Sequence, residues 1–281
     1  MAEAATPTSA FTVRSVRPSP HLRTVVESFG GRRGVFAAFC IVRPLHARPD
    51  VFAEFYFRDP YRVGSAEQGF SAAPASVLVG PTTRPGAHLG LDGECENFTI
   101  RFTPTGASRL LGLPAHEIVD QATSMKDLLG RRLMPLESHL QRARTFDERI
   151  AVAEAFLGRM LDEARPYGAI DHAARLLARS HGRLSLDFIA RRAGVSMRQL
   201  QRRFLLEVGA TPKLYARLHR FSAAIDARQA RPDSAWSSIA AAFGYADQAH
   251  LAHECRQLAD MTPNSLLASL GSVSVSETYN P

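Results

Sequence analysis

Residues 197–204, MRQLQRRF, carry side chains that can hydrogen-bond to the edges of DNA bases. Gln201 and Arg202 follow Arg198 by three and four residues, so a helix would hold all three on one face. Arginine can bind guanine through two hydrogen bonds, and glutamine can bind adenine in the same way. The spacing therefore predicts a helix that presents a base-reading face to the major groove.

A second group of candidate base-reading residues lies about fifty residues further on, at Gln248, Ala249, Ala252 and His253. The alanines can contact only a thymine methyl group or a sugar. We therefore expect the first group to carry more of the discrimination between bases.

The two groups occupy equivalent places in a repeated unit. Gly194 aligns with Gly244 at an offset of 50, and the residues after the turn align at an offset of 51. In each copy a short helix leads to a glycine, which can adopt the positive φ of a sharp turn. Ser196 or Asp247 then caps a second helix. This order of elements predicts two helix-turn-helix units.

Both units end alike, because Thr211 and Thr262 are each followed by a proline at the first helical position. We expect the helix after Thr211 to run to about Arg228 and to join the two units. Two recognition helices on a stiff connector could enter major-groove segments about 34 Å apart. One chain would then read DNA as many repressors do only as dimers.

The inward stripe of each recognition helix is expected to be apolar. Leu200 and Phe204 face the core in the first copy, and their counterparts in the second are Leu251 and Cys255. Trp236 is expected to anchor the second core. His250 and His253 have a spacing that metal ligands can share, but Cys255 should point inward, so we predict no metal site.

The basic excess of the chain lies in the same region. Residues 170–270 hold fourteen Arg and Lys against eight Asp and Glu, a balance of +6 in a chain of net charge +7. Such a balance suits a phosphate backbone, although it also suits a solvated surface. Basic side chains and the N–H groups beside helix caps give the candidate phosphate contacts: Ser196, Arg203, Thr211, Lys213, Arg217, Arg220, Asp247, His250, Arg256 and Thr262.

The remaining chain predicts an α+β protein, with a β-rich domain and flanking helices before an all-α domain of two joined units. Short apolar runs at 51–57, 75–81 and 96–102 predict strands, and helical patterns follow Pro104. The expected division is a disordered tail at 1–10, a β-rich effector-binding or dimerisation domain at 11–165, a DNA-binding domain at 170–270 and a flexible tail at 271–281.

Residues 170–270 resemble the DNA-binding domain of the AraC/XylS family. The likeness lies in LDFIARRAGVSMRQLQRRF, in GATPK and in SIAAAFGYADQAHLAHECRQLADMTPNSL. The sequence departs from the family at Cys255, where phenylalanine is usual. Ala249 and Ala252, which face the groove, are less polar than is common in the family, and Glu254 is acidic.

The front half is similar to the amino-terminal domain of AraC-type regulators without a well-characterised ligand, through LVGPTTRP, FTIRFTPTGASRLLGLPAHEIVDQ and DLLG. The resemblance implies a bacterial transcription regulator that binds promoter DNA and acts with RNA polymerase. It also implies a small-molecule effector of unknown identity and a homodimer formed through the amino-terminal domain.

The three cysteines, Cys40, Cys95 and Cys255, are odd in number and widely separated, which indicates a reducing compartment without disulfides or structural zinc. We expect Cys95, in DGECEN, to lie at a hairpin tip. The chain has no run of eighteen apolar residues, and because residues 1–13 lack a basic stretch followed by an apolar one, we do not expect a secretory leader. The expected location is the cytoplasm, with no membrane contact.

The sequence is compared most usefully with two alternative classes of function, an enzyme and an architectural DNA-binding protein. A cupin-like enzyme would need clustered histidine and glutamate, but His46, His88, Glu54 and Glu94 have unhelpful spacing. No nucleophile elbow, P-loop or dinucleotide fingerprint occurs, so neither catalytic residues nor a cofactor are expected. An architectural DNA-binding protein without an effector remains an alternative, in which the front half serves only to dimerise.

Overall fold

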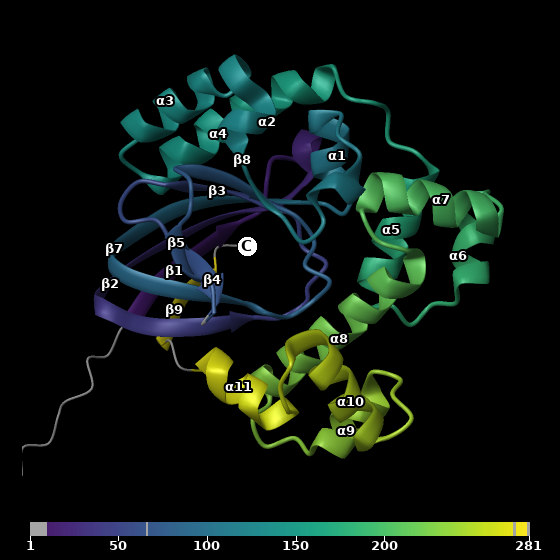
Figure 1. Ribbon diagram of the computed structural model, residues 1–281. Coiled ribbons are helices and arrows are strands. Elements are labelled where there is room, and N and C mark those ends of the chain that lie inside the picture. The colour runs from purple at the N-terminus through teal and green to yellow at the C-terminus, as the bar shows by residue number, and fades with distance from the viewer. Residues whose placement is uncertain (1–9, 66, 272–273, 280–281) are drawn as a thin grey trace, which may run out of the picture.

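The computed structural model describes residues 10–65, 67–271 and 274–279. It confirms the α+β class, because a β-rich part with flanking helices precedes a helical part (Figure 1). Among the described residues, no helix combines the length and the apolar character needed to cross a membrane.

One sheet dominates the β-rich part, in the order β8-β6-β3-β7-β2-β1-β9, with β4 and β5 paired beside β7. The long strands β2 and β7 are antiparallel, and a register shift between Phe36 and Ile41 bends them. The bounds are β1 Ala10–Val16, β2 Val26–Leu45, β3 Phe52–Tyr56, β4 Arg62–Ser65, β5 Gly69–Ala72, β6 Ser76–Val79, β7 Ala87–Phe102, β8 Ala122–Ser124 and β9 Ser274–Tyr279.

The predicted strand at 96–102 is only the second half of β7, which begins at Ala87. The expectation that Cys95 lies at a hairpin tip is wrong, since Cys95 pairs with Gly34 of β2 and is 1% exposed. The acidic and glycine residues around it resemble a turn locally. Pairing along the whole length of β2 overrides that local signal.

Helices cover one face of the sheet and enclose the main core (Figure 1). Phe29, Phe98 and Ile100 from the strands pack with Leu140 and Leu157 from the helices. The bounds are η1 Pro20–Leu22, α1 Gly106–Leu111, η2 Ala115–Ile118, α2 Met125–Leu129, η3 Gly130–Arg132, α3 Met134–Arg142 and α4 Phe146–Asp162.

The helical part forms two small cores along one connecting helix. Phe204 and Tyr215 lie in the first core, and Trp236 and Cys255 lie in the second. Leu214 of the connecting helix packs against both. The bounds are α5 Ala169–Arg179, α6 Leu186–Ala193, α7 Met197–Val208, α8 Pro212–Ala230, α9 Trp236–Ala242, α10 Gln248–Ala259 and α11 Pro263–Gly271.

The carboxy-terminal segment differs from the flexible tail expected at 271–281. Residues 274–279 form β9, which pairs in parallel with β1 from Ala10 to Ser15. Alternation of valine and serine in this segment fits a strand, and the unpaired edge of β1 supplies a partner. Residues 1–9 of the expected amino-terminal tail lie outside the described residues, and residue 10 already belongs to β1.

Candidate nucleic-acid interface

A sharp turn and a capping box position the first recognition helix, α7. Gly194 ends α6 with a φ of 66°. Ser196 Oγ accepts a hydrogen bond from Gln199 N at 3.2 Å, and Gln199 Oε1 accepts one from Ser196 N at 2.9 Å. This reciprocal pair satisfies two backbone donors at the helix start. The first unit, which consists of α6 and α7, therefore has the local geometry that its sequence predicts.

Burial of Leu200 and Phe204 fixes the orientation of α7 about its axis, since both are fully buried. Arg198, Gln201 and Arg202 consequently lie on the opposite side and are exposed. The structure thus brings the three candidate base-reading residues of the first unit together on one open helix face. Their contact with bases stays a prediction.

The second unit, which consists of α9 and α10, repeats this arrangement. Gly244 has a φ of 75°, and Asp247 Oδ1 accepts a hydrogen bond from His250 N at 2.7 Å. Leu251 and Cys255 lie on the inner face of α10 and are fully buried. Of the candidate base-reading residues, Gln248, Ala249 and His253 are exposed, and Ala252 is half-buried.

Two of the candidate phosphate contacts have partners inside the protein. Arg217 forms an ion pair with Glu254 and donates a hydrogen bond to Gln257. Arg203 donates to Glu207 at 2.9 Å. Sequence reasoning noted Glu254 only as an acidic residue, but it is 3% exposed and lies on the inward stripe with Leu251 and Cys255. Its place on that stripe, three residues after Leu251, was a signal that could have identified it.

The other candidate phosphate contacts divide into caps, exposed cations and ring contacts. Thr211 accepts from Leu214 N, and Thr262 accepts from Ser265 N, each at 3.2 Å. The remaining members are exposed or lie on aromatic rings: Lys213 and Arg256 are exposed, Arg220 lies 5.1 Å from the ring centre of Tyr245, and the ring of His250 lies 5.3 Å from that of Tyr245.

The three residues that prompted the metal hypothesis do not converge. Cys255 points into the core, whereas His250 and His253 are exposed. Burial, with a smaller contribution from Glu254, raises the pKa of the Cys255 thiol to about 12. Within the part of the chain that the structure describes, no group of three or more His, Cys, Asp or Glu side chains could hold a metal ion.

The two glutamates considered for a cupin-like enzyme have different partners in the fold. Glu54 is buried, and it accepts hydrogen bonds from Tyr56 Oη at 2.6 Å and from Asn97 Nδ2 at 3.2 Å. Glu94 instead pairs with Arg33 at 3.3 Å. Glu54 therefore belongs to an internal hydrogen-bond network of the sheet.

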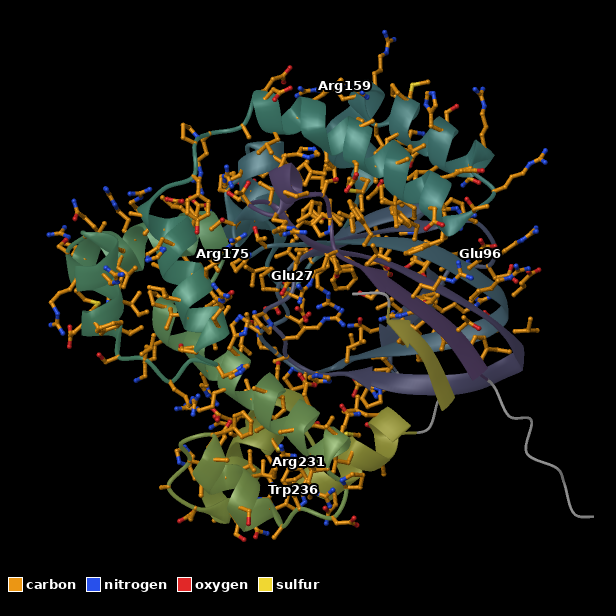
Figure 2. The ribbon with its side chains drawn as sticks, turned by 180° about the vertical axis from the view of Figure 1, so that it is seen from behind. Glu27, Glu96, Arg159, Arg175, Arg231 and Trp236 are labelled. Atoms are coloured by element: carbon orange, nitrogen blue, oxygen red, sulfur yellow. The ribbon has the colours of Figure 1, made fainter. Side chains whose placement is uncertain are left out.

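A polar cleft separates the β-rich part from the helical part. One cavity of about 670 Å³ and another of about 390 Å³ share lining residues, among them Glu27, Asp50, Arg179 and His219. We call this space the interdomain cleft. Figure 2 shows Glu27 and Arg175 near the junction of the two parts. Strands β2 and β7 and the loop that precedes β3 supply one wall, and α5 and α8 supply most of the other.

The cleft contains a half-buried cation, Arg48, that makes no direct ion pair with a described carboxylate. Arg48 packs over the ring of Phe52 at 4.7 Å, and burial lowers its pKa. No described carboxylate lies within ion-pair distance of it, because Asp50 instead pairs with Arg101 at 2.6 Å. Arg48 Nε and His219 Nε2 are both buried and lack hydrogen-bond partners. Asp50 and Glu54 attract Arg48 from beyond ion-pair distance, and an acidic group entering the cleft would meet its charge directly.

Two known domain families match parts of the chain. A helix-turn-helix domain matches residues 189–269, which contain both units except the first three residues of α6. A domain of unknown function, DUF6597, matches residues 14–124 of the β-rich part. No curated protein matches the chain.

Several solved structures are similar to the chain. ToxT from Vibrio cholerae O395 is 12% identical with a TM-score of 0.48, and the match covers 87% of this chain and 99% of that chain. An AraC-type regulator from Chromobacterium violaceum is 28% identical with a TM-score of 0.34, over 37% of this chain and 92% of that chain. The AraC-like transcriptional activator CuxR is 14% identical with a TM-score of 0.27, over 75% and 86%. Since these TM-scores are below 0.5, the likenesses carry no function over to this chain.

Proposed function

A helix-turn-helix domain matches residues 189–269, and from this premise we propose that the chain is a sequence-specific transcription regulator of the AraC type. Helices α7 and α10 would enter adjacent major-groove segments of promoter DNA. One observation carries this proposal: two capped helices expose their first turns while α8 connects them. If the two units were only structural helical hairpins, the repetition of an N-terminal cap and of an exposed helix face in both would have no explanation.

The first unit would supply most of the base recognition. Arg198, Gln201 and Arg202 would bind base edges, whereas Ala249 and Ala252 would contribute only apolar contacts. Phosphate contacts would come from exposed cations such as Lys213 and Arg256, and from the N–H groups beside Thr211 and Thr262. Arg217 is the weakest of the candidates, since Glu254 already holds its guanidinium group.

A small molecule that binds the amino-terminal domain would control this DNA binding. The interdomain cleft supports this proposal, because it has room for a small ligand and because Arg48, Arg101 and Arg179 line it and could pair with an acidic group. A ligand in the cleft would contact both the β-rich part and the helical part. It would thereby change how strongly the two parts are held together. Action in the cytoplasm with RNA polymerase, and a homodimer formed through the amino-terminal domain, complete the proposal.

The test is to select binding sites for the full-length protein from a random pool of duplex DNA. We expect enrichment of an asymmetric site whose two parts lie about one helical turn apart. Failure to enrich any sequence would contradict the proposed function. A thermal-shift screen with small organic acids then distinguishes an effector-controlled regulator from an architectural protein, because only the former should be stabilised.

A further inference from the structure

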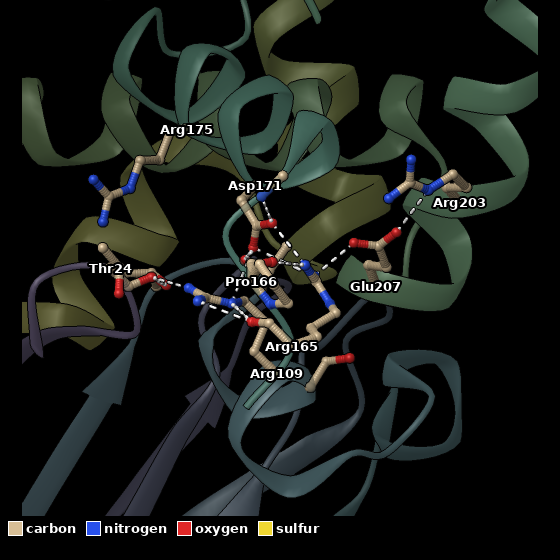
Figure 3. A network of polar contacts seen from close by, with 12 residues as sticks. Thr24, Arg109, Arg165, Pro166, Asp171, Arg175, Arg203 and Glu207 are labelled. Carbon is tan, nitrogen blue, oxygen red and sulfur yellow. Dashed lines mark hydrogen bonds and ion pairs between the residues drawn. The ribbon is translucent and has the colours of Figure 1, made fainter. Parts of the chain in front are cut away.

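Glu207, near the end of α7, holds two arginines from different parts of the chain. Its Oε1 accepts a hydrogen bond from Arg203 Nε on the same helix at 2.9 Å. Its Oε2 accepts one from Arg165 Nη2, which lies 42 residues earlier in the segment between α4 and α5, at 2.6 Å. The Glu207 side chain is 14% exposed, so solvent screens these contacts only in part. Figure 3 shows the carboxylate between the two guanidinium groups.

Arg165 continues the network to a buried acid. Its Nη1 donates to Asp171 Oδ2 at 2.7 Å, and its Nη2 lies 3.3 Å from Oδ1. Asp171 also accepts hydrogen bonds from Thr105 Oγ1 and, at 2.7 Å, from Gly168 N. Burial alone would raise the pKa of Asp171, but the hydrogen bonds from Arg165, Thr105 and Gly168 outweigh burial and lower it. The carboxylate is therefore charged and firmly held.

Arg109 of α1 anchors this network in the β-rich part. Its Nε and Nη2 donate to the carbonyl oxygen of Arg165 at 3.3 and 3.2 Å, and its Nη1 donates to the carbonyl oxygen of Thr24 at 3.1 Å. Arg109 Nε also lies 3.7 Å from Asp171 Oδ1. A continuous set of charged contacts thus runs from α7 to α1 (Figure 3).

A second contact holds the same end of α7 against the β-rich part. Gly209 ends the helix with a φ of 86°, and a Cβ at this position would lie 2.7 Å from the carbonyl oxygen of Ala115 in η2. The two backbones therefore touch without a side chain between them. If the end of α7 is displaced, it must therefore push on or pull away from η2. Movement of the helix is thereby coupled to the β-rich part.

We propose that Glu207 relays DNA contact at Arg203 to the amino-terminal domain through Arg165 and Asp171. The inference rests on the proposed function, because it takes Arg203 to be a phosphate contact. Arg203 is 38% exposed and can turn to a phosphate without leaving the helix. A DNA phosphate and Glu207 compete for one guanidinium group. When Arg203 binds the phosphate, Glu207 pairs with Arg165 alone. The stronger ion pair then reduces the motion of the segment from Arg165 to Asp171.

Thermodynamic linkage makes the relay work in both directions. If a change in the β-rich part breaks the contact between Arg165 and Glu207, Glu207 pairs with Arg203 alone. Arg203 is then less available to the phosphate backbone. Because coupling between two sites is reciprocal, DNA must in turn alter the linker segment. The relay can therefore be tested with DNA alone, before any effector is identified.

The experiment measures amide hydrogen exchange of the full-length protein with and without the duplex enriched by selection. In the wild type we expect DNA to slow exchange of the 165–171 segment, including the Gly168 amide, by about threefold or more. Glu207→Gln should keep DNA binding but abolish this slowing. Arg203→Gln, a change at a more exposed position, should abolish it too and also weaken binding.

Glu163→Gln is the matched control, because it makes the same chemical change at an exposed ion pair with Arg132 that has no connection to α7. This control should behave as the wild type does. The relay would be overturned if the wild type binds DNA without slower exchange in 165–171. It would also be overturned if DNA slows exchange equally in the wild type and in Glu207→Gln. A wild-type protein that enriches no DNA would instead overturn the proposed function, and the relay with it.

Discussion

Arg217 of α8 and Glu254 of α10 form an ion pair that clasps the second unit to the connecting helix. Glu254 is 4% exposed at its side chain, whereas Arg217 is 31% exposed, so the acid depends on the arginine for compensation. Burial and the neighbouring Glu254 carboxylate raise the pKa of the Tyr245 hydroxyl. The pair thus holds a charged site at the edge of an otherwise apolar core.

Arg217→Ala is expected to destabilise the protein by about 1–3 kcal/mol, because it leaves a buried carboxylate without its partner. Urea denaturation followed by circular dichroism measures this change. Arg256→Ala, which removes an exposed cation from the same helix pair, is the control and should leave stability within about 0.5 kcal/mol. A stable Arg217→Ala protein with weaker DNA binding and a smaller salt slope would show that Arg217 binds phosphate instead.

Arg202→Ala is expected to cost about 1–3 kcal/mol in binding to the selected site and to relax preference at one base pair. The reason is that a bidentate contact with guanine has no counterpart on random DNA. Fluorescence anisotropy on specific and random duplexes measures both quantities. Arg159→Ala, an exposed change on α4, should alter neither (Figure 2). An equal loss on both duplexes would contradict the base-reading role.

The second unit is expected to open more readily than the first. Cys255 fills the position that Phe204 fills in α7, and a thiol buries less apolar area than an aromatic ring. In native-state hydrogen exchange, residues 237–258 should exchange faster than residues 187–208 without DNA and slow markedly with it. Equal protection of the two segments in the free protein would mean that Trp236 and its neighbours already fill the space.

The protein is expected to lose stability as the pH falls from about 6.5 towards 4, because of His219. Burial lowers the pKa of His219 from 6.5 to about 4. Between these values the unfolded chain binds a proton that the folded chain does not, so protonation favours unfolding. Burial raises the pKa of Glu27 and Asp226, and these acids act in the opposite direction at the acidic end.

Comparison with His219→Gln isolates the histidine contribution, since the other groups of the cleft are unchanged. The difference in free energy of unfolding between pH 7.5 and pH 5 should shrink by about 1 kcal/mol or more in the variant. Urea titrations at the two pH values supply the measurement. An unchanged difference would show that His219 is protonated equally in the folded and unfolded states.

Local rules made the two units predictable from sequence. Ser196, Asp247 and Thr211 act on backbone groups three residues away, and Gly194 adopts a conformation that few other residues tolerate. Such features need no knowledge of the rest of the chain. The inward stripes followed for the same reason, because helical spacing alone assigns their side.

Contacts between distant segments could not be predicted in this way. Arg165 and Glu207 are 42 residues apart, and Arg217 and Glu254 are 37 apart. Each of these side chains alone looks like a solvated surface charge. The full length of β7 and the buried place of Cys95 likewise depend on pairing with β2. Sequence therefore located the candidate DNA-reading face, whereas its attachment to the β-rich part required the structure.

The pairing of β9 with β1 has a consequence for the cooperativity of unfolding. The second unit is tethered at one end by α8 and at the other by a strand that belongs to the sheet. If its core opens, the released chain remains a closed loop, much as a cross-linked ring does. Loop closure limits the conformations that such a ring can reach, and so limits the entropy gained by opening. The six residues of β9 that pair with β1 thus stabilise the second unit, including its recognition helix α10, from the edge of the sheet.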